Sequence, residues 1–129
     1  MKLITKDSTC IYYGNAEHSF VNDILVCEDV NYGDCHEDNV QIHNDITAPD
    51  DFTLLKYDYV NDEFVVSKRY LDFCEEKRKE RDALLAETDW WALSDRTMTQ
   101  AEIDYRQALR DVPAQAGFPT EITWPTKPE

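Results

Sequence analysis

The amino-acid sequence predicts an α+β protein. A small antiparallel β-domain is expected over residues 1–66, and a helical hairpin with an extended, proline-rich tail over residues 67–129. Three observations support this division. Apolar residues recur at every second position in the first part, and with a helical period from about Ser67. Acidic residues outnumber basic ones 14 to 3 over residues 1–66 but only 13 to 10 over residues 67–129. Four of the five prolines lie from Pro113 onward, where they exclude a helix.

The first part contains four segments rich in β-branched and aromatic residues, which are typical of strands. In the second of them, Phe20, Ile24 and Val26 are predicted to share one face. The fourth reads as a hairpin that turns at Asn61-Asp62. The acidic stretches between segments, 28–39 and 44–51, are expected to be loops. The predicted strand segments are residues 2–14, 19–29, 39–45 and the hairpin 53–67.

The first helix is predicted to begin after Ser67, a residue suited to the N-cap, and to run to about Thr88. Its two ends are apolar on one face, but residues 75–82, EEKRKERD, are polar all round. A helix segment of that kind often bridges two bodies through solvent. We therefore expect a strut whose middle makes few contacts and which joins the β-domain to the rest of the chain.

The second helix is predicted to start at a capping box formed by Thr99 and Glu102, and to end at Pro113. The tail beyond it is expected to be held in place by Phe118 and Trp124. Residues at helical spacing predict one narrow apolar face, which consists of Met98, Ala101, Tyr105, Ala108, Leu109 and Val112.

Composition and charge exclude several classes of function. The formal net charge of −14 argues against nucleic acid and anionic membrane surfaces as partners, and favours a soluble protein or a basic protein partner. No apolar run is long enough to span a membrane. The N-terminus, MKLITKDSTC, lacks the apolar stretch of a secretory signal, so the four cysteines are expected to be free thiols in a reducing cytoplasm.

No pattern indicates catalysis, a metal site or a cofactor. The chain has no glycine-rich phosphate loop and no nucleophile motif. Cys27, Cys35 and His36 lie among carboxylates, but without the paired spacing of a structural zinc site. The same stretch departs from the calcium-loop pattern at Gly33 and Val40. A solvated acidic loop is the favoured interpretation, and we expect neither an enzyme nor a bound metal.

Trp90 and Trp91 are adjacent in the connection between the two helices, so both cannot face the same core. One is expected to fill the space between the helices. The other is expected to lie on the tail or to be exposed to a partner, because tryptophan is frequent among binding hot spots. An equally good interpretation is that the two tryptophans belong to an additional small apolar core and contact no partner.

Arg106 and Arg110 follow Glu102 at four-residue steps on the second helix. They could form pairs on a solvated helix face, or present guanidinium groups to the carboxylates or carbonyls of a partner. Ile103 lies nearly opposite the apolar stripe and is expected to be exposed. The candidate partner-binding residues are therefore Ile103, Arg106 and Arg110, with whichever of Trp90 and Trp91 lies outside.

The C-terminal part resembles a known family. The stretch RDALLAETDWWALSD, followed by YRQALRD and by a tail containing ITWPTKP, resembles the bacteriophage tail assembly chaperone family, whose module also closes many tail-fibre assembly proteins. The resemblance covers about residues 78–128 and does not extend to residues 1–66. The positions that carry it are Arg81, Leu84, Leu85, Asp89, Trp90, Tyr105, Arg106, Leu109, Arg110, Trp124, Pro125 and Pro128.

The resemblance implies a phage-encoded protein in the bacterial cytoplasm that helps a tail or tail-fibre protein to fold or assemble. This role requires protein–protein binding without catalysis, and leaves a homo-oligomer open. The alternative is a structural virion protein, a tail adaptor or fibre component that stays in the particle. The sequence does not identify the client, and a third class, a small enzyme or inhibitor acting on the host, has no supporting residue.

Overall fold

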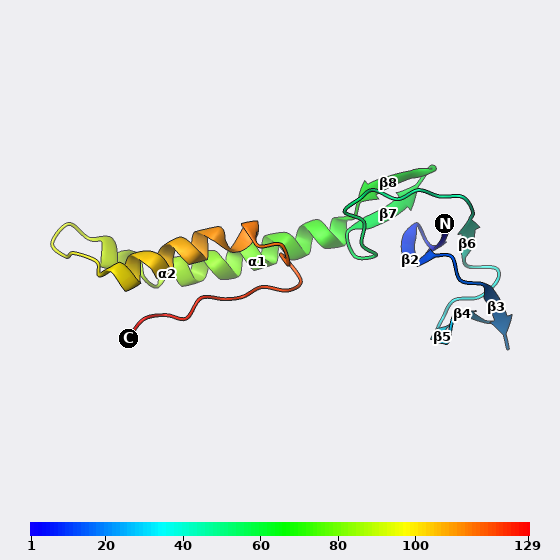
Figure 1. The fold of residues 1–129 in the computed structure, drawn as a ribbon, viewed down its shortest axis with the longest axis horizontal. Coiled ribbons are helices and arrows are strands. Elements are labelled where there is room, and N and C mark those ends of the chain that lie inside the picture. The colour runs from blue at the N-terminus through cyan, green and yellow to red at the C-terminus, as the bar shows by residue number, and fades with distance from the viewer. The chain divides into compact units, whose positions relative to one another are not determined.

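The computed structural model describes all 129 residues and divides into two compact units, Met1–Tyr70 and Leu71–Glu129 (Figure 1). The first unit holds the strands, the second holds the hairpin of helices, and the chain is therefore α+β. Helix α1 begins two residues before the end of the first unit. No helix is both long and apolar enough to cross a membrane.

The β unit contains two antiparallel sheets. The larger sheet has the strand order β6-β1-β2-β7-β8, and the smaller has the order β3-β4-β5. The strands are β1 (Lys2–Lys6), β2 (Thr9–Gly14), β3 (His18–Val21), β4 (Ile24–Cys27), β5 (Val30–Tyr32), β6 (Gln41–His43), β7 (Tyr57–Val60) and β8 (Glu63–Val66).

Three hairpins in this unit turn through two residues that both have positive φ. These pairs are Asp7-Ser8, Asn22-Asp23 and Asn61-Asp62, with φ between 49° and 68°. Positive φ at both central residues gives a turn whose twist matches that of the flanking strands, and Asn and Asp tolerate it better than most residues. The hairpin at Asn61-Asp62 is the one the sequence predicted.

The other two hairpins correct the strand predictions. Residues 2–14 form two strands, not one, because the chain reverses at Asp7-Ser8. The reversal at Asn22-Asp23 likewise divides the second predicted strand, so Leu25 is buried and Ile24 exposed. The predicted common face of Phe20, Ile24 and Val26 is therefore wrong, and β5 forms inside a stretch expected to be loop.

Two apolar clusters fill the β unit. One is built on Ile4, Leu25 and the thiols of Cys27 and Cys35, and it joins the small sheet to the large one. The other is built on Leu3, Cys10 and Tyr59. Aromatic rings extend the second cluster across β7 and β8, where the centroids of Tyr59 and Phe64 lie 4.9 Å apart.

Helix α1 (Lys68–Ala86) has Ser67 as its N-cap, since the Oγ atom of Ser67 accepts a hydrogen bond from the amide of Tyr70 at 3.2 Å. The predicted helix start is confirmed. The middle of α1, residues 75–82, is mostly exposed, as predicted, but it is not free of contacts within the helical unit. The guanidinium of Arg78 lies 5.5 Å from the ring centroid of Phe118, and the side chain of Arg81 is only 20% exposed.

Helix α2 (Gln100–Asp111) begins at the predicted capping box. The amide of Glu102 donates to the Thr99 hydroxyl at 3.3 Å, and the Thr99 amide donates to the Glu102 carboxylate at 2.8 Å. A 3₁₀ turn, Asp89–Ala92, lies between the helices, and another, Val112–Ala114, follows α2. Residues 122–129 lie in neither a helix nor a strand.

Candidate protein-docking surface of the helical unit

The helical unit is held together by a small aromatic cluster. Trp91, Tyr105 and Leu109 form its buried centre, and the rings of Trp91 and Tyr105 lie 6.1 Å apart. The prediction that one tryptophan fills the space between the helices is confirmed for Trp91. The side chains that pack around this centre come from α1, the connection and the tail, and are Leu84, Leu85, Met98 and Trp124.

The buried face of α2 is shifted from the predicted stripe. Tyr105, Leu109 and Val112 are buried as predicted, but Ala101 is exposed. Glu102 and Arg106 are instead only 8% exposed. The periodicity of apolar residues could not reveal this, because two of the inward positions are occupied by charged side chains.

Arg106 connects α2 to the C-terminal end of α1. Its Nη1 atom donates to the carbonyl of Leu85 at 3.0 Å and to the Thr88 hydroxyl at 2.7 Å, and its Nη2 atom donates to Asp89 at 2.9 Å. The last carbonyls of a helix lack intrahelical partners, and a cation there also complements the helix dipole. The expectation that Arg106 lies on an exposed face is therefore wrong.

Arg96 fixes the connection between the helices. Its guanidinium lies 4.6 Å from the ring centroid of Trp90, and its Nη2 atom donates to Glu102 at 2.5 Å. The hydrogen bond from the Thr99 amide, followed by that from Arg96, holds the pKa of the Glu102 carboxyl below its usual value. Trp90 thus stacks against an arginine that is itself anchored at the N-terminus of α2.

Three large apolar side chains of this region remain exposed. Trp90 and Leu93 are each 56% exposed, and Ile103 is 42% exposed. The amide of Leu93 donates to the carbonyl of Trp90 at 3.4 Å, which places the two residues one turn apart. Arg110 is exposed as well, on the same helix as Ile103.

The predicted candidates therefore separate into two groups. Trp90, Ile103 and Arg110 lie at the surface, whereas Trp91 and Arg106 are buried inside the helical unit. Sequence reasoning did not identify Leu93. No signal in the sequence distinguishes it from Trp91 and Met98, apolar residues of the same connection that do pack into the cluster.

The side chains that could ligate a metal do not come together in a site. No group of three or more His, Cys, Asp or Glu side chains is arranged to hold a metal ion. Cys27 and Cys35 are buried in the apolar cluster of the β unit, and burial raises the pKa of the Cys27 thiol. The reactive and metal-binding form of cysteine is the thiolate, which this environment disfavours.

Comparison with known proteins identifies the helical unit. Residues 74–129 match the family model for the phage tail assembly chaperone protein. The resemblance seen in the sequence is confirmed for this segment. No curated protein and no solved structure matches the chain.

The structure explains several of the positions that carry this resemblance. Asp89 and Arg106 form an ion pair, while Tyr105 and Leu109 line the aromatic cluster together with Leu84. These positions maintain the geometry of the helical unit. Trp90 and Arg110, two further positions of this resemblance, are exposed.

Proposed function

We propose that the protein is a phage tail assembly chaperone that binds a tail or tail-fibre protein through its helical unit and catalyses no reaction. The match of residues 74–129 to the chaperone family carries this proposal, because it supports a role in tail assembly. Such a protein would act in the bacterial cytoplasm during assembly. Its client would be recognised by an exposed surface, since the internal residues are already engaged.

The proposed docking surface consists of Trp90, Leu93, Ile103 and Arg110. Tryptophan and arginine are the residues most enriched among binding hot spots, and an exposed tryptophan offers a large contact area at low entropic cost. Arg96 lies over the ring of Trp90, which restricts the conformations open to that side chain before a partner binds. An ordered contact residue loses less conformational freedom on binding.

The proposal is tested by complementing a phage that lacks the gene with variants of the protein. Ile103→Asp and Arg110→Glu leave the aromatic cluster intact, so both variants should fold normally. We expect the affinity of the variant for the phage's own tail proteins to fall by at least about tenfold, which corresponds to about 1.4 kcal/mol of binding free energy, and phage yield to fall with it.

Leu71→Asp provides the matched control. Leu71 is 54% exposed in α1, and it lies outside the proposed surface. This variant should support wild-type yield. If the two docking variants also support wild-type yield, the surface is merely solvated, and if Ile103→Asp unfolds the protein, Ile103 belongs to the core.

Mass spectrometry of purified particles separates the chaperone from the alternative, a tail adaptor or fibre component. A chaperone should be present in infected cells and absent from purified particles. Stoichiometric amounts in the particle would show instead that the protein is a permanent part of the virion.

A further inference from the structure

The small sheet β3-β4-β5 has two unlike faces. Its antiparallel register pairs Phe20 with Leu25 and Leu25 with Tyr32, and these side chains pack into the core of the β unit. Alternate residues of a strand point to opposite faces. The opposite, outer face is therefore built from Ser19, Val21, Ile24, Val26 and Asn31.

This outer face carries no charged side chain, although 31% of the residues in the chain are charged. Val21 is 53% exposed and Ile24 is 37% exposed. The outer face of an antiparallel sheet is ordinarily polar, and natural sheets use charged side chains to prevent unwanted association. An uncharged apolar centre is instead what the middle of a protein–protein interface looks like.

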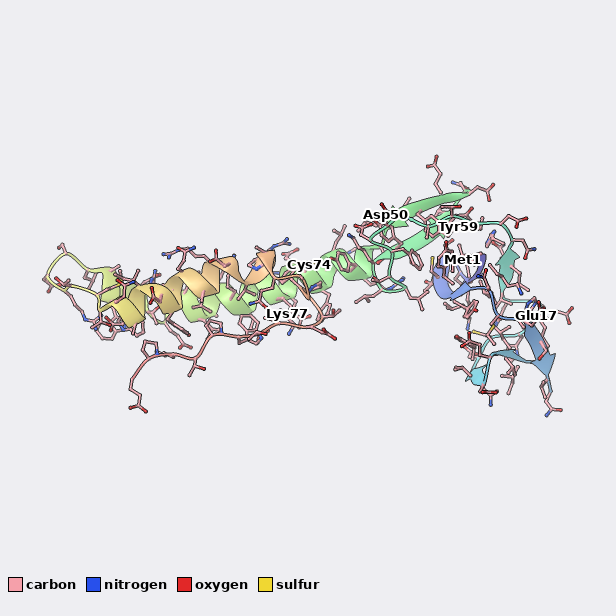
Figure 2. The ribbon with its side chains drawn as sticks, viewed as in Figure 1. Met1, Glu17, Asp50, Tyr59, Cys74 and Lys77 are labelled. Carbon is pink, nitrogen blue, oxygen red and sulfur yellow. The ribbon has the colours of Figure 1, made fainter.

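The sequence around the small sheet is acidic, and acidic residues occupy the turns at both ends of this face. From Asp7 to Leu55 the sequence contains eleven Asp and Glu residues and no Lys or Arg. The turn at Asn22-Asp23 bounds the face at one end and the turn at Glu28-Asp29 bounds it at the other. Glu17 lies directly before β3 (Figure 2).

The basic side chains nearest in sequence are already paired. Lys6 donates to the carboxylate of Asp34 at 2.8 Å, and Lys2 donates to the carbonyl of Ala16 at 3.0 Å. Neither lysine belongs to the small sheet. Lys6 therefore offsets the charge of Asp34, whereas the carboxylates at the two turns that bound the face, Asp23, Glu28 and Asp29, form no ion pair with Lys or Arg.

We propose that the outer face of β3-β4-β5 is a second docking site, for a protein partner whose contact patch has an apolar centre and a rim of Lys and Arg. Charge complementarity selects this occupant. A second copy of the chain would place one acidic rim against another, and such like-charge contacts are unfavourable in an interface. This site lies in the β unit, and its existence does not depend on the function proposed for the helical unit.

The test uses two short synthetic peptides of equal charge as probes. One alternates lysine with valine, and the other alternates lysine with serine. Each is titrated into isotope-labelled full-length protein while amide resonances are followed by NMR. The lysine–valine peptide should shift the amides of β3, β4 and β5 in a saturable way, and bind at least about tenfold more tightly than the lysine–serine peptide.

Substitutions locate the binding. The double variant Val21→Ser with Ile24→Ser should weaken binding of the lysine–valine peptide by at least about tenfold. The matched control, Val60→Ser with Val65→Ser, changes valines that are 37% and 40% exposed on β7 and β8, and should leave binding unchanged. Loss of the dispersed amide spectrum would mean that the double variant does not fold. The single variant Val21→Thr is then used instead, because threonine has the shape of valine and adds a hydroxyl.

Three outcomes would overturn the proposal. Equal binding of the two peptides would mean that charge alone attracts them, and shifts confined to other strands would place the site elsewhere. The third outcome is tested by analytical sedimentation of the protein without peptide. Self-association that disappears in the Val21→Ser, Ile24→Ser variant would show that a second copy occupies the face.

Discussion

In the β unit the buried side chains are apolar, thiol-bearing or hydroxylic, whereas in the helical unit two charged side chains, Glu102 and Arg106, are also buried. The β unit acquires its shape from tight turns between strands that cover two apolar clusters. The helical unit has a single cluster, and it adds a hydrogen bond donated by Arg106 at the end of α1 and one accepted by the Glu102 carboxylate at the start of α2. A short hairpin of helices can thus compensate for a small core by connecting its ends through polar contacts.

The largest expected effect comes from the apolar cluster of the helical unit. Leu109 is fully buried, so Leu109→Ala should destabilise the protein by about 2–5 kcal/mol through lost burial and a cavity. All three tryptophans lie at positions 90, 91 and 124. Tryptophan fluorescence during urea unfolding therefore reports on this unit, and an unchanged midpoint would contradict the described core.

The second effect tests the polar connection. Arg106→Ala removes the donor to Leu85 and Thr88, and should cost about 1–3 kcal/mol because buried acceptors lose a partner. Arg110→Ala, on the exposed side of the same helix, should change stability by no more than about 0.5 kcal/mol. If the two substitutions lower the free energy of unfolding equally in the same urea titration, the buried hydrogen bonds of Arg106 do not stabilise the helical unit.

The capping box should contribute less. Thr99→Ala removes the hydroxyl that accepts from the Glu102 amide, and should cost about 1 kcal/mol. Thr99→Ser retains the hydroxyl and should restore most of the loss. The free energy of unfolding from urea titrations of both variants checks this, and a Thr99→Ser variant as unstable as Thr99→Ala would argue against the cap.

Glu102 also gives the helical unit an acid sensitivity. Its pKa in the folded state is lowered from the ordinary value of 4.5, first by the Thr99 amide and then by Arg96. The stabilisation is therefore complete above that ordinary value and is lost as the pH falls through the lowered folded pKa. Glu102→Gln should flatten the acid limb of the stability curve measured by tryptophan fluorescence, and an unaltered limb would assign acid sensitivity to other carboxyls.

The smallest effect is expected in the β unit, and it is an increase in stability rather than a loss. Asp62 has φ of 64°, which glycine adopts without strain, so Asp62→Gly should stabilise the hairpin by about 0.5 kcal/mol. Asp82→Gly in α1, the same substitution within a helix, should destabilise by about 0.5–1 kcal/mol. Thermal unfolding of the two variants gives the comparison, and shifts of the same sign would contradict it.

The sequence predicted one of three similar turns. Asn61-Asp62 was recognisable because apolar and aromatic residues flank it at matching positions. The same dipeptide at Asn22-Asp23 was missed, because the apolar residues on its two sides were read as one continuous strand. Asp7-Ser8 contains neither Asn nor Gly and resembles the interior of a strand.

The sequence also predicted the elements of the helical unit better than the roles of its charged residues. Caps and apolar spacing are local properties, so the capping box at Thr99 and the buried Leu109 were predicted correctly. The inward orientation of Arg106 depends on acceptors about twenty residues away, at Leu85 and Thr88. No periodicity within α2 contains that information.

Most paired strands of the β unit are close to each other in the sequence. Four of its six strand pairings, β1–β2, β3–β4, β4–β5 and β7–β8, join consecutive strands through short turns. Such pairings have low contact order and can form before distant segments meet. Only β1–β6 and β2–β7 require long loops to close. These two pairings should therefore set the folding rate of the unit.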